Sequence, residues 1–244
     1  MGQMRNWVWL FAMLLMPAAV EAGPWAREQG TYFVALSAEK DSAGGHYHSL
    51  YGEYGLNPRL TLGLQFGVSG EETSGLIWLQ RARSTGANQW SSSFGLGAVR
   101  RDGKTVPVMQ TSIAWGRGTD SIPLLKRMRG GGWVAVDLQT TIAGKIEGGA
   151  RETDDPHIIY ESPEYLTPET TFKAQGTLGW NATDKLKLIN QLRLEDRDNT
   201  GFSAKWAGAL VFAVHGPLKI ELGASHPLSG DGEAALKLGT WVEF

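Results

Sequence analysis

The chain is 244 residues long, has a formal net charge of −2 and contains no Cys. The nearly balanced charge excludes the strongly basic surface that nucleic-acid-binding proteins usually carry. The absence of Cys excludes disulfide bonds and a cysteine-linked lipid anchor.

The first 22 residues are predicted to be a secretory signal peptide. Arg5 supplies a positive charge, an apolar run covers residues 7–16, and a small-residue cleavage site ends at Ala22. A transmembrane anchor is the alternative, but the apolar run is shorter than the roughly 20 residues that a membrane-spanning helix needs. The mature domain is therefore predicted to cover residues 23–244, which is long enough for one large β domain.

Apolar and polar residues alternate along almost the whole mature chain. The pattern is clearest at residues 60–69, where every second residue from Leu60 to Val68 is apolar. A period of two is that of a β-strand whose two faces meet different surroundings. The same period predicts strands at residues 31–39, 46–56, 60–69, 75–83, 91–100, 106–116, 133–145, 170–180, 186–195, 202–214, 218–225 and 236–244.

The predicted fold is all-β, a closed antiparallel up-and-down transmembrane β-barrel of about 12 strands. A sheet in hydrocarbon must close on itself because each unpaired backbone group there costs several kcal/mol. Short turns at residues 57–59, 181–184 and 215–217 fall at the predicted periplasmic end, and the longest connection, 146–169, falls at the outer end. The long connection 117–132 is an exception on the periplasmic side. A soluble periplasmic sandwich or lipocalin-like barrel uses the same alternation and is the alternative.

The last strand, residues 236–244, alternates strictly and ends on Phe244. Together with the signal peptide, it resembles bacterial outer-membrane β-barrel proteins, whose last strand commonly ends in Phe. The segments 23–33 and 54–63 also resemble functionally unassigned proteobacterial barrel proteins. This resemblance implies an outer-membrane location, contact with the membrane lipids and lipopolysaccharide, and insertion by barrel-assembly machinery through the C-terminal strand. It carries over no functional residue.

Several aromatic residues fall near the predicted periplasmic ends of strands, as in an interfacial girdle. These membrane-interface candidates are Tyr54, Trp115, Trp133, Trp180 and Phe244. Scattered core aromatics of a soluble sandwich are the alternative interpretation.

Charged residues of both signs occupy the opposite face of many strands, which is the lumen of the predicted barrel. The lumen-lining candidates are Glu53, Asp137, Lys173, Lys187, Arg193, Glu195, Lys205, Lys219, Glu221 and Lys237, and Lys145 shares their register. Such charges either line a water-filled pore or pair with one another and fill the lumen. The sequence leaves these two alternatives open.

The sequence lacks the His-x-Ser spacing with which outer-membrane lipid hydrolases activate a serine. The nearest approach pairs His48 with Ser49, but adjacent strand residues point to opposite faces. His46 and His48 share a face, yet a stable metal site needs three or four ligands. No cofactor, metal or enzyme activity is therefore expected.

Two connections carry charge. The acidic residues 151–164 are interpreted as a solvated loop, with divalent-ion or lipopolysaccharide binding as the alternative. Residues 121–129 are interpreted as a connector with a helical turn, and its basic side chains give contact with anionic lipid as the alternative.

The predicted function is a passive pore or transporter for small polar solutes. A structural or assembly barrel with a plugged lumen is the second hypothesis. A lipid-modifying enzyme is the least favoured, because the His-x-Ser spacing is missing.

Overall fold

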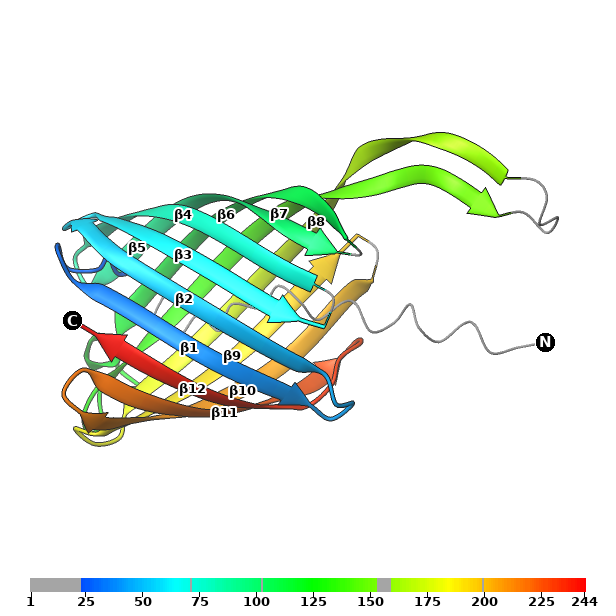
Figure 1. Cartoon of the computed structure of the whole chain (residues 1–244). Coiled ribbons are helices and arrows are strands. Elements are labelled where there is room, and N and C mark those ends of the chain that lie inside the picture. The colour runs from blue at the N-terminus through cyan, green and yellow to red at the C-terminus, as the bar shows by residue number, and fades with distance from the viewer. Residues whose placement is uncertain (1–22, 71, 102, 153–158, 199) are drawn as a thin grey trace.

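The computed structural model describes residues 23–70, 72–101, 103–152, 159–198 and 200–244. The predicted signal peptide lies outside these residues. Twelve strands of the described chain form one closed barrel (Figure 1). The strands are β1 (Tyr32–Asp41), β2 (His46–Asn57), β3 (Leu60–Ser69), β4 (Glu72–Thr85), β5 (Asn88–Arg101), β6 (Lys104–Gly118), β7 (Gly132–Glu152), β8 (Ile159–Asn181), β9 (Leu186–Arg197), β10 (Gly201–His215), β11 (Leu218–Ser229) and β12 (Ala235–Glu243).

Every strand pairs antiparallel with its neighbour in the sequence, and β1 pairs with β12 to close the wall. The seam continues to the C-terminus, where Tyr32 N donates to Phe244 O and Phe244 N donates to Tyr32 O, both at 3.0 Å. Closure pairs the backbone groups that an open sheet would leave exposed at its edges. The predicted all-β fold class and the number of strands are confirmed.

The two ends of the barrel differ, and each is named here for what it carries. The terminal end, on the left of Figure 1, carries the start of β1 and the C-terminal Phe244; the hairpin end, on the right, carries the projecting β7–β8 hairpin. Tight turns at the terminal end use glycines with positive φ, as at Gly86 (φ 61°) between β4 and β5 and at Gly216 (φ 53°) between β10 and β11.

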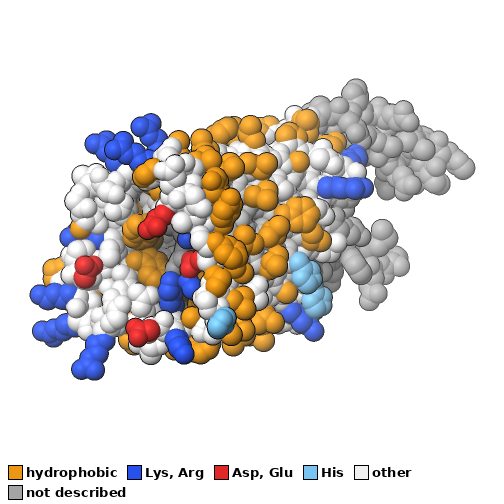
Figure 2. Space-filling view, turned by 60° about the vertical axis from the view of Figure 1, so that its left-hand side comes forward, with side chains coloured by type: hydrophobic (Ala, Val, Ile, Leu, Met, Phe, Trp, Pro, Cys, Tyr) orange, Lys and Arg blue, Asp and Glu red, His pale blue; other side chains and the backbone are white. Residues whose placement is uncertain are grey.

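Side chains of alternate character line the two faces of the wall. In β3 the inward residues Thr61 and Gln65 are buried, whereas Leu62, Leu64 and Phe66 are exposed on the outside. Figure 2 shows hydrophobic side chains covering much of the outer wall, and Lys and Arg side chains at the terminal end. The outer apolar surface includes Leu36, Leu64, Ile77, Leu96, Ile113, Leu138, Phe172, Leu192, Leu210, Leu222 and Leu238. An apolar belt around a polar interior suits hydrocarbon outside and water or polar side chains inside.

Among the residues that the structure describes, no helix is both long and apolar enough to cross a membrane.

The predicted long connection at residues 146–169 was wrong. β7 instead continues to Glu152 and β8 begins at Ile159, and the two pair out to Glu152↔Ile159 beyond the barrel wall (Figure 1). The prolines and charged residues of this segment favour a loop. Strands that project past the barrel wall do not contact hydrocarbon, so they need no apolar face and lack the alternation that predicted the other strands. The acidic side chains of residues 151–164 lie outside the described side chains, so their predicted role stays a prediction.

The connection between β6 and β7 stays long, as predicted. It contains a short 3₁₀ helix, Thr119–Ser121, followed by turns in which Leu125 N and Lys126 N both donate to Ile122 O at 2.9 Å. The helical turn predicted at residues 121–129 is therefore present as consecutive turns.

Candidate functional site

The lumen is lined on one side by neutral polar side chains from β3–β6, here called the neutral wall. Its members are Gln65, Gln80, Ser91, Ser93, Gln110 and Ser112. They occupy alternate inward positions of four adjacent strands, and Ser93 and Ser112 share a hydrogen bond of 2.8 Å between their hydroxyls. Hydroxyl and amide groups both donate and accept hydrogen bonds, so this wall can contact neutral polar solutes or water.

The opposite side, built by β8–β12, carries charge and is called the charged wall. Its members are Lys173, Arg193, Glu195, Lys205, Glu221 and Lys237. Glu195 lies between two cations, 3.3 Å from Lys173 Nζ and 2.8 Å from an Arg197 guanidinium nitrogen. Because these groups are removed from bulk water, pairing is what makes their burial tolerable.

A second ion-paired group lies nearer the terminal end. Glu221 is 2% exposed; it accepts a hydrogen bond of 2.9 Å from Trp241 Nε1 and pairs with Lys237 Nζ at 3.0 Å. Lys219 pairs with Glu243 one layer closer to the end. Charges on neighbouring strands thus neutralise one another across the sheet.

The ten lumen-lining candidates from the sequence lie on the inner side of the wall. Glu53, Glu195, Lys205 and Glu221 are buried, and Asp137, Lys173, Lys187, Arg193, Lys219 and Lys237 are half-buried. The structure brings Lys173 to Glu195 and Lys237 to Glu221, and it places Lys187 Nζ 5.8 Å from the centre of the Trp133 ring. Lys145, in contrast, is exposed near the hairpin end.

Two features of the interior were missed at the sequence level. One is a row of inward aromatic rings with centroid separations of about 6 Å. This aromatic row consists of Trp241, Phe33, Tyr51 and Trp78. Large inward aromatics on β12, β1, β2 and β4 are its sequence signal, and they show that part of the lumen is packed with side chains.

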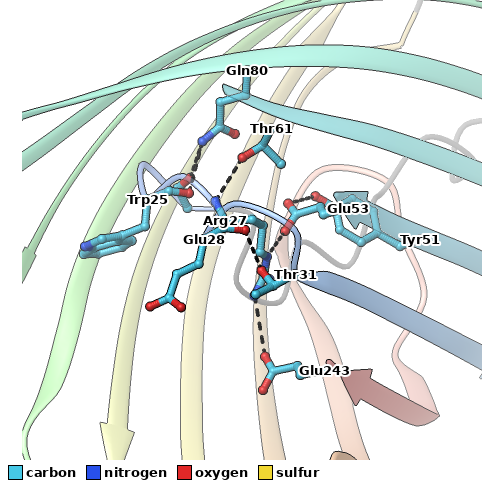
Figure 3. Close-up of polar contacts among 10 residues, drawn as sticks. Trp25, Arg27, Glu28, Thr31, Tyr51, Glu53, Thr61, Gln80 and Glu243 are labelled. Atoms are coloured by element: carbon cyan, nitrogen blue, oxygen red, sulfur yellow. Dashed lines mark hydrogen bonds and ion pairs between the residues drawn. The ribbon is translucent and has the colours of Figure 1, made fainter. Parts of the chain in front are cut away.

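The second missed feature is the segment of residues 23–30, here called the strap. It precedes β1 and lies inside the terminal mouth of the barrel (Figure 3). Pro24 is fully buried, and Arg27 forms an ion pair with Glu53 of β2. Glu53 also accepts a hydrogen bond from Tyr51, so the strap joins the aromatic row. A polar segment ahead of the first strand carries no periodicity from which this position could be predicted.

Two of the cavities in the described part of the barrel lie beside the strap. The central cavity, of about 100 Å³, lies between the neutral wall and Lys173, Arg193, Glu195 and Lys205. The terminal cavity, of about 370 Å³, is lined by residues 23–27 of the strap and by inward residues of β6–β9. Gly23, Asp137 and Gln175 line both cavities and so mark the junction between them.

The sequence matches no protein-family model and no curated protein. Solved structures of similar fold include the COG4313 outer membrane channel from Pseudomonas putida F1, at 12% identity and a TM-score of 0.59 over 94% of this chain and 100% of that one. A KdgM porin is 9% identical, with a TM-score of 0.57 over 87% of this chain and 99% of its own. The translocator domain of the autotransporter NalP from Neisseria meningitidis is 12% identical, with a TM-score of 0.54 over 89% and 90% of the two chains. The fold is that of a bacterial outer-membrane β-barrel.

In this outer-membrane barrel fold, four of the aromatic candidates lie on the outside near the terminal end. Tyr54 stacks on Tyr32 with ring centroids 4.5 Å apart, and Phe244 is 69% exposed. Trp115 Nε1 donates to Asn88 Oδ1 at 3.3 Å, and Trp180 Nε1 donates to Arg129 O at 2.7 Å.

Trp133 differs from the expectation of an interfacial position. Its place in β7 has the same parity as the inward residues Ala135 and Asp137, and its ring lines the terminal cavity. Gly179 on β8 makes room for it, since a Cβ there would lie 2.3 Å from the indole. Because Trp133 lies near a strand end, the sequence predicted its position along the barrel axis correctly. It did not predict that the side chain is on the inner face of the sheet.

The histidines near the β1–β2 turn face away from the lumen. His46 and His48 are exposed, whereas Ser49 points inward and shares a hydrogen bond of 2.7 Å with Ser37. Within the described part of the chain, no three His, Cys, Asp or Glu side chains are grouped so that they could hold a metal ion.

Proposed function

We propose that the protein is a passive channel for small polar solutes across the outer membrane. The observation that carries this proposal is the pair of cavities that follow one another inside the barrel and share Gly23, Asp137 and Gln175. The central cavity is lined mainly by hydroxyl, amide and charged groups, as a water-filled path requires. The lining of the terminal cavity is more apolar but includes Arg27, Asp137 and Gln175. The structural likeness to a porin and an outer membrane channel supports the same role.

Conductance in planar lipid bilayers tests this proposal. We expect purified, folded protein to give steady conductance steps, and liposomes that contain it to admit small sugars. Heat modifiability on gels, in which a folded barrel migrates differently before and after boiling, verifies folding in the same sample. A folded protein that gives no steps and admits no sugar contradicts the channel.

The second candidate is a structural or assembly barrel whose lumen is closed by side chains. The ion pairs of the charged wall and the aromatic row favour it, because both fill space that a wide pore would leave to water. Electrical silence of a folded protein would support this candidate. Neither candidate assigns a catalytic step to the barrel.

We further propose that residues 1–22 direct export and that the outer apolar belt contacts membrane lipid and, at the outer face, lipopolysaccharide. The assembly machinery would engage the C-terminal strand, which ends at Phe244. In this orientation the terminal end faces the periplasm. N-terminal sequencing of protein from the outer-membrane fraction tests export; a chain that begins at Met1, or that stays in the soluble periplasmic extract, contradicts it.

Anionic phospholipid is the proposed partner of the β6–β7 connection. Lys126, Arg127 and Arg129 are exposed there, and Leu124 is 90% exposed beside them. Replacing the three basic residues with Gln is expected to reduce the anionic phospholipid that copurifies with the barrel. Unchanged lipid content would remove this partner and leave the channel proposal intact.

A further inference from the structure

The strap is held by hydrogen bonds to three adjacent strands of the barrel (Figure 3). Gln80 Nε2 on β4 donates to the carbonyl oxygens of Gly23 and Trp25, at 3.2 and 3.3 Å. The Arg27 backbone N donates to Thr61 Oγ1 on β3 at 2.9 Å. At the end of the strap, Gly30 N donates to the carbonyl oxygen of Gly55 on β2 at 2.8 Å. Hydrogen bonds to the strap backbone at both of its ends, from the Gln80 side chain and with the Gly55 carbonyl, therefore fix its course across the mouth.

Arg27 adds a side-chain anchor to these backbone bonds. Its guanidinium pairs with Glu53, whose side chain is 3% exposed, and lies 3.6 Å from Glu243. It also lies over the Phe33 ring, with 4.5 Å between Cζ and the ring centroid. Arg27 thus contacts β2, β12 and β1, on both sides of the seam that closes the barrel.

The wall is shaped to receive the strap. A Cβ on Gly55 would lie 1.9 Å from the carbonyl oxygen of Glu28, and a Cβ on Gly116 would lie 2.6 Å from Pro24 Cγ. Neither glycine has a positive φ, so their backbone conformations do not require glycine. The missing side chain is therefore explained by the closeness of the strap.

The strap also lines both cavities of the lumen. Residues 23–27 line the terminal cavity, and Gly23, together with Asp137 and Gln175, also lines the central cavity. We infer that the strap sets the size limit for solutes at the terminal end, and that Arg27 is the residue that positions it. This inference rests on the proposed channel function.

Single-channel conductance and solute size limit test the inference. The variant Arg27→Met with Glu53→Gln removes the ion pair without leaving a buried charge behind. Gly55→Ala tests the fit independently, because the added methyl group must displace the strap backbone. Both changes are expected to raise conductance roughly twofold or more and to admit larger sugars, since pore width governs both quantities.

Each variant has a matched control. Arg59→Met makes a related substitution in an exposed turn. Gly52→Ala places a methyl group on the same strand where the nearest atom is 3.9 Å away. Neither control should change conductance. Heat modifiability shows which variants are folded. Because two different variants displace the strap, the inference can still be tested if one of them does not fold.

The outcomes separate the inference from the proposed function. If the wild-type protein conducts and the variants give larger conductance steps, both the strap inference and the channel function are supported. Equal conductance in wild type and folded variants overturns the strap inference but leaves the channel. Silent wild type with conducting variants supports the strap as a barrier and contradicts an open channel. Silence of all folded proteins overturns both.

Discussion

The neutral wall and the charged wall are parts of the inner face of one sheet, in which inward and outward residues alternate. The two walls are polar for different reasons. The neutral wall uses hydroxyl and amide groups, and Ser93 and Ser112 join two of its strands by a hydrogen bond between their hydroxyls. The charged wall couples cations and anions between strands, as at Glu195 and Glu221. Removing a hydroxyl costs one hydrogen bond, whereas removing one charge leaves its partner uncompensated. Single substitutions in the charged wall are therefore expected to lower the free energy of unfolding more than single substitutions in the neutral wall.

The strongest test of this comparison is Glu221→Gln. The amide can still accept from Trp241, but Lys237 loses the carboxylate that lies 3.0 Å from it. We expect the free energy of unfolding to fall by about 3–5 kcal/mol, as for other buried pairs that lose one partner. Urea titration in lipid vesicles, followed by heat modifiability, measures the change. Ser91→Ala, at a buried position of the neutral wall, is the matched control; equal losses in the two variants would abolish the distinction between the walls.

A second test measures the ion selectivity of the Glu195→Gln variant. This carboxylate faces the central cavity together with Lys173, Arg193 and Lys205, so its removal leaves those cations in excess. We expect the reversal potential in a salt gradient to shift toward anion selectivity.

Gln65→Leu on the facing wall is the control for that measurement, because it removes a polar group without changing charge. A reversal potential that moves equally in both variants would show that the charged wall does not govern selectivity. A shift toward cations in Glu195→Gln would contradict the assigned geometry.

Alternation within single strands carried most of the fold prediction. Hydrocarbon favours an apolar side chain at each outward position regardless of its neighbours, so Leu62, Leu64 and Phe66 reveal the outer face of β3 without any knowledge of β2 or β4. The same logic gave the number of strands and the inward register of the charged candidates. It failed at the β7–β8 hairpin, where strands extend past the belt and the apolar requirement ends.

The contents of the lumen were harder to predict because they depend on contacts between distant segments. Nothing local to Arg27 indicates that its side chain meets Glu53 and Glu243, which are far apart in the sequence and are brought together by the β1–β12 seam. Gly55 and Gly116 look like ordinary strand glycines until the strap is placed beside them. The sequence therefore left an open pore and a lumen filled by side chains as alternatives. It could not predict that the strap lies inside the mouth of the barrel.

The smallest expected effect lies within the neutral wall, in the hydroxyl pair of Ser93 and Ser112. Either Ser→Ala change removes one hydrogen bond of 2.8 Å and should lower the free energy of unfolding by about 0.5–1.5 kcal/mol. The double variant should cost little more than either single one, because the second hydroxyl has already lost its partner. Urea titrations of the two single variants and the double variant provide this double-mutant cycle. Strictly additive losses would mean that each hydroxyl acts alone, and a loss as large as that of Glu221→Gln would show that neutral pairs stabilise this barrel as strongly as charged ones.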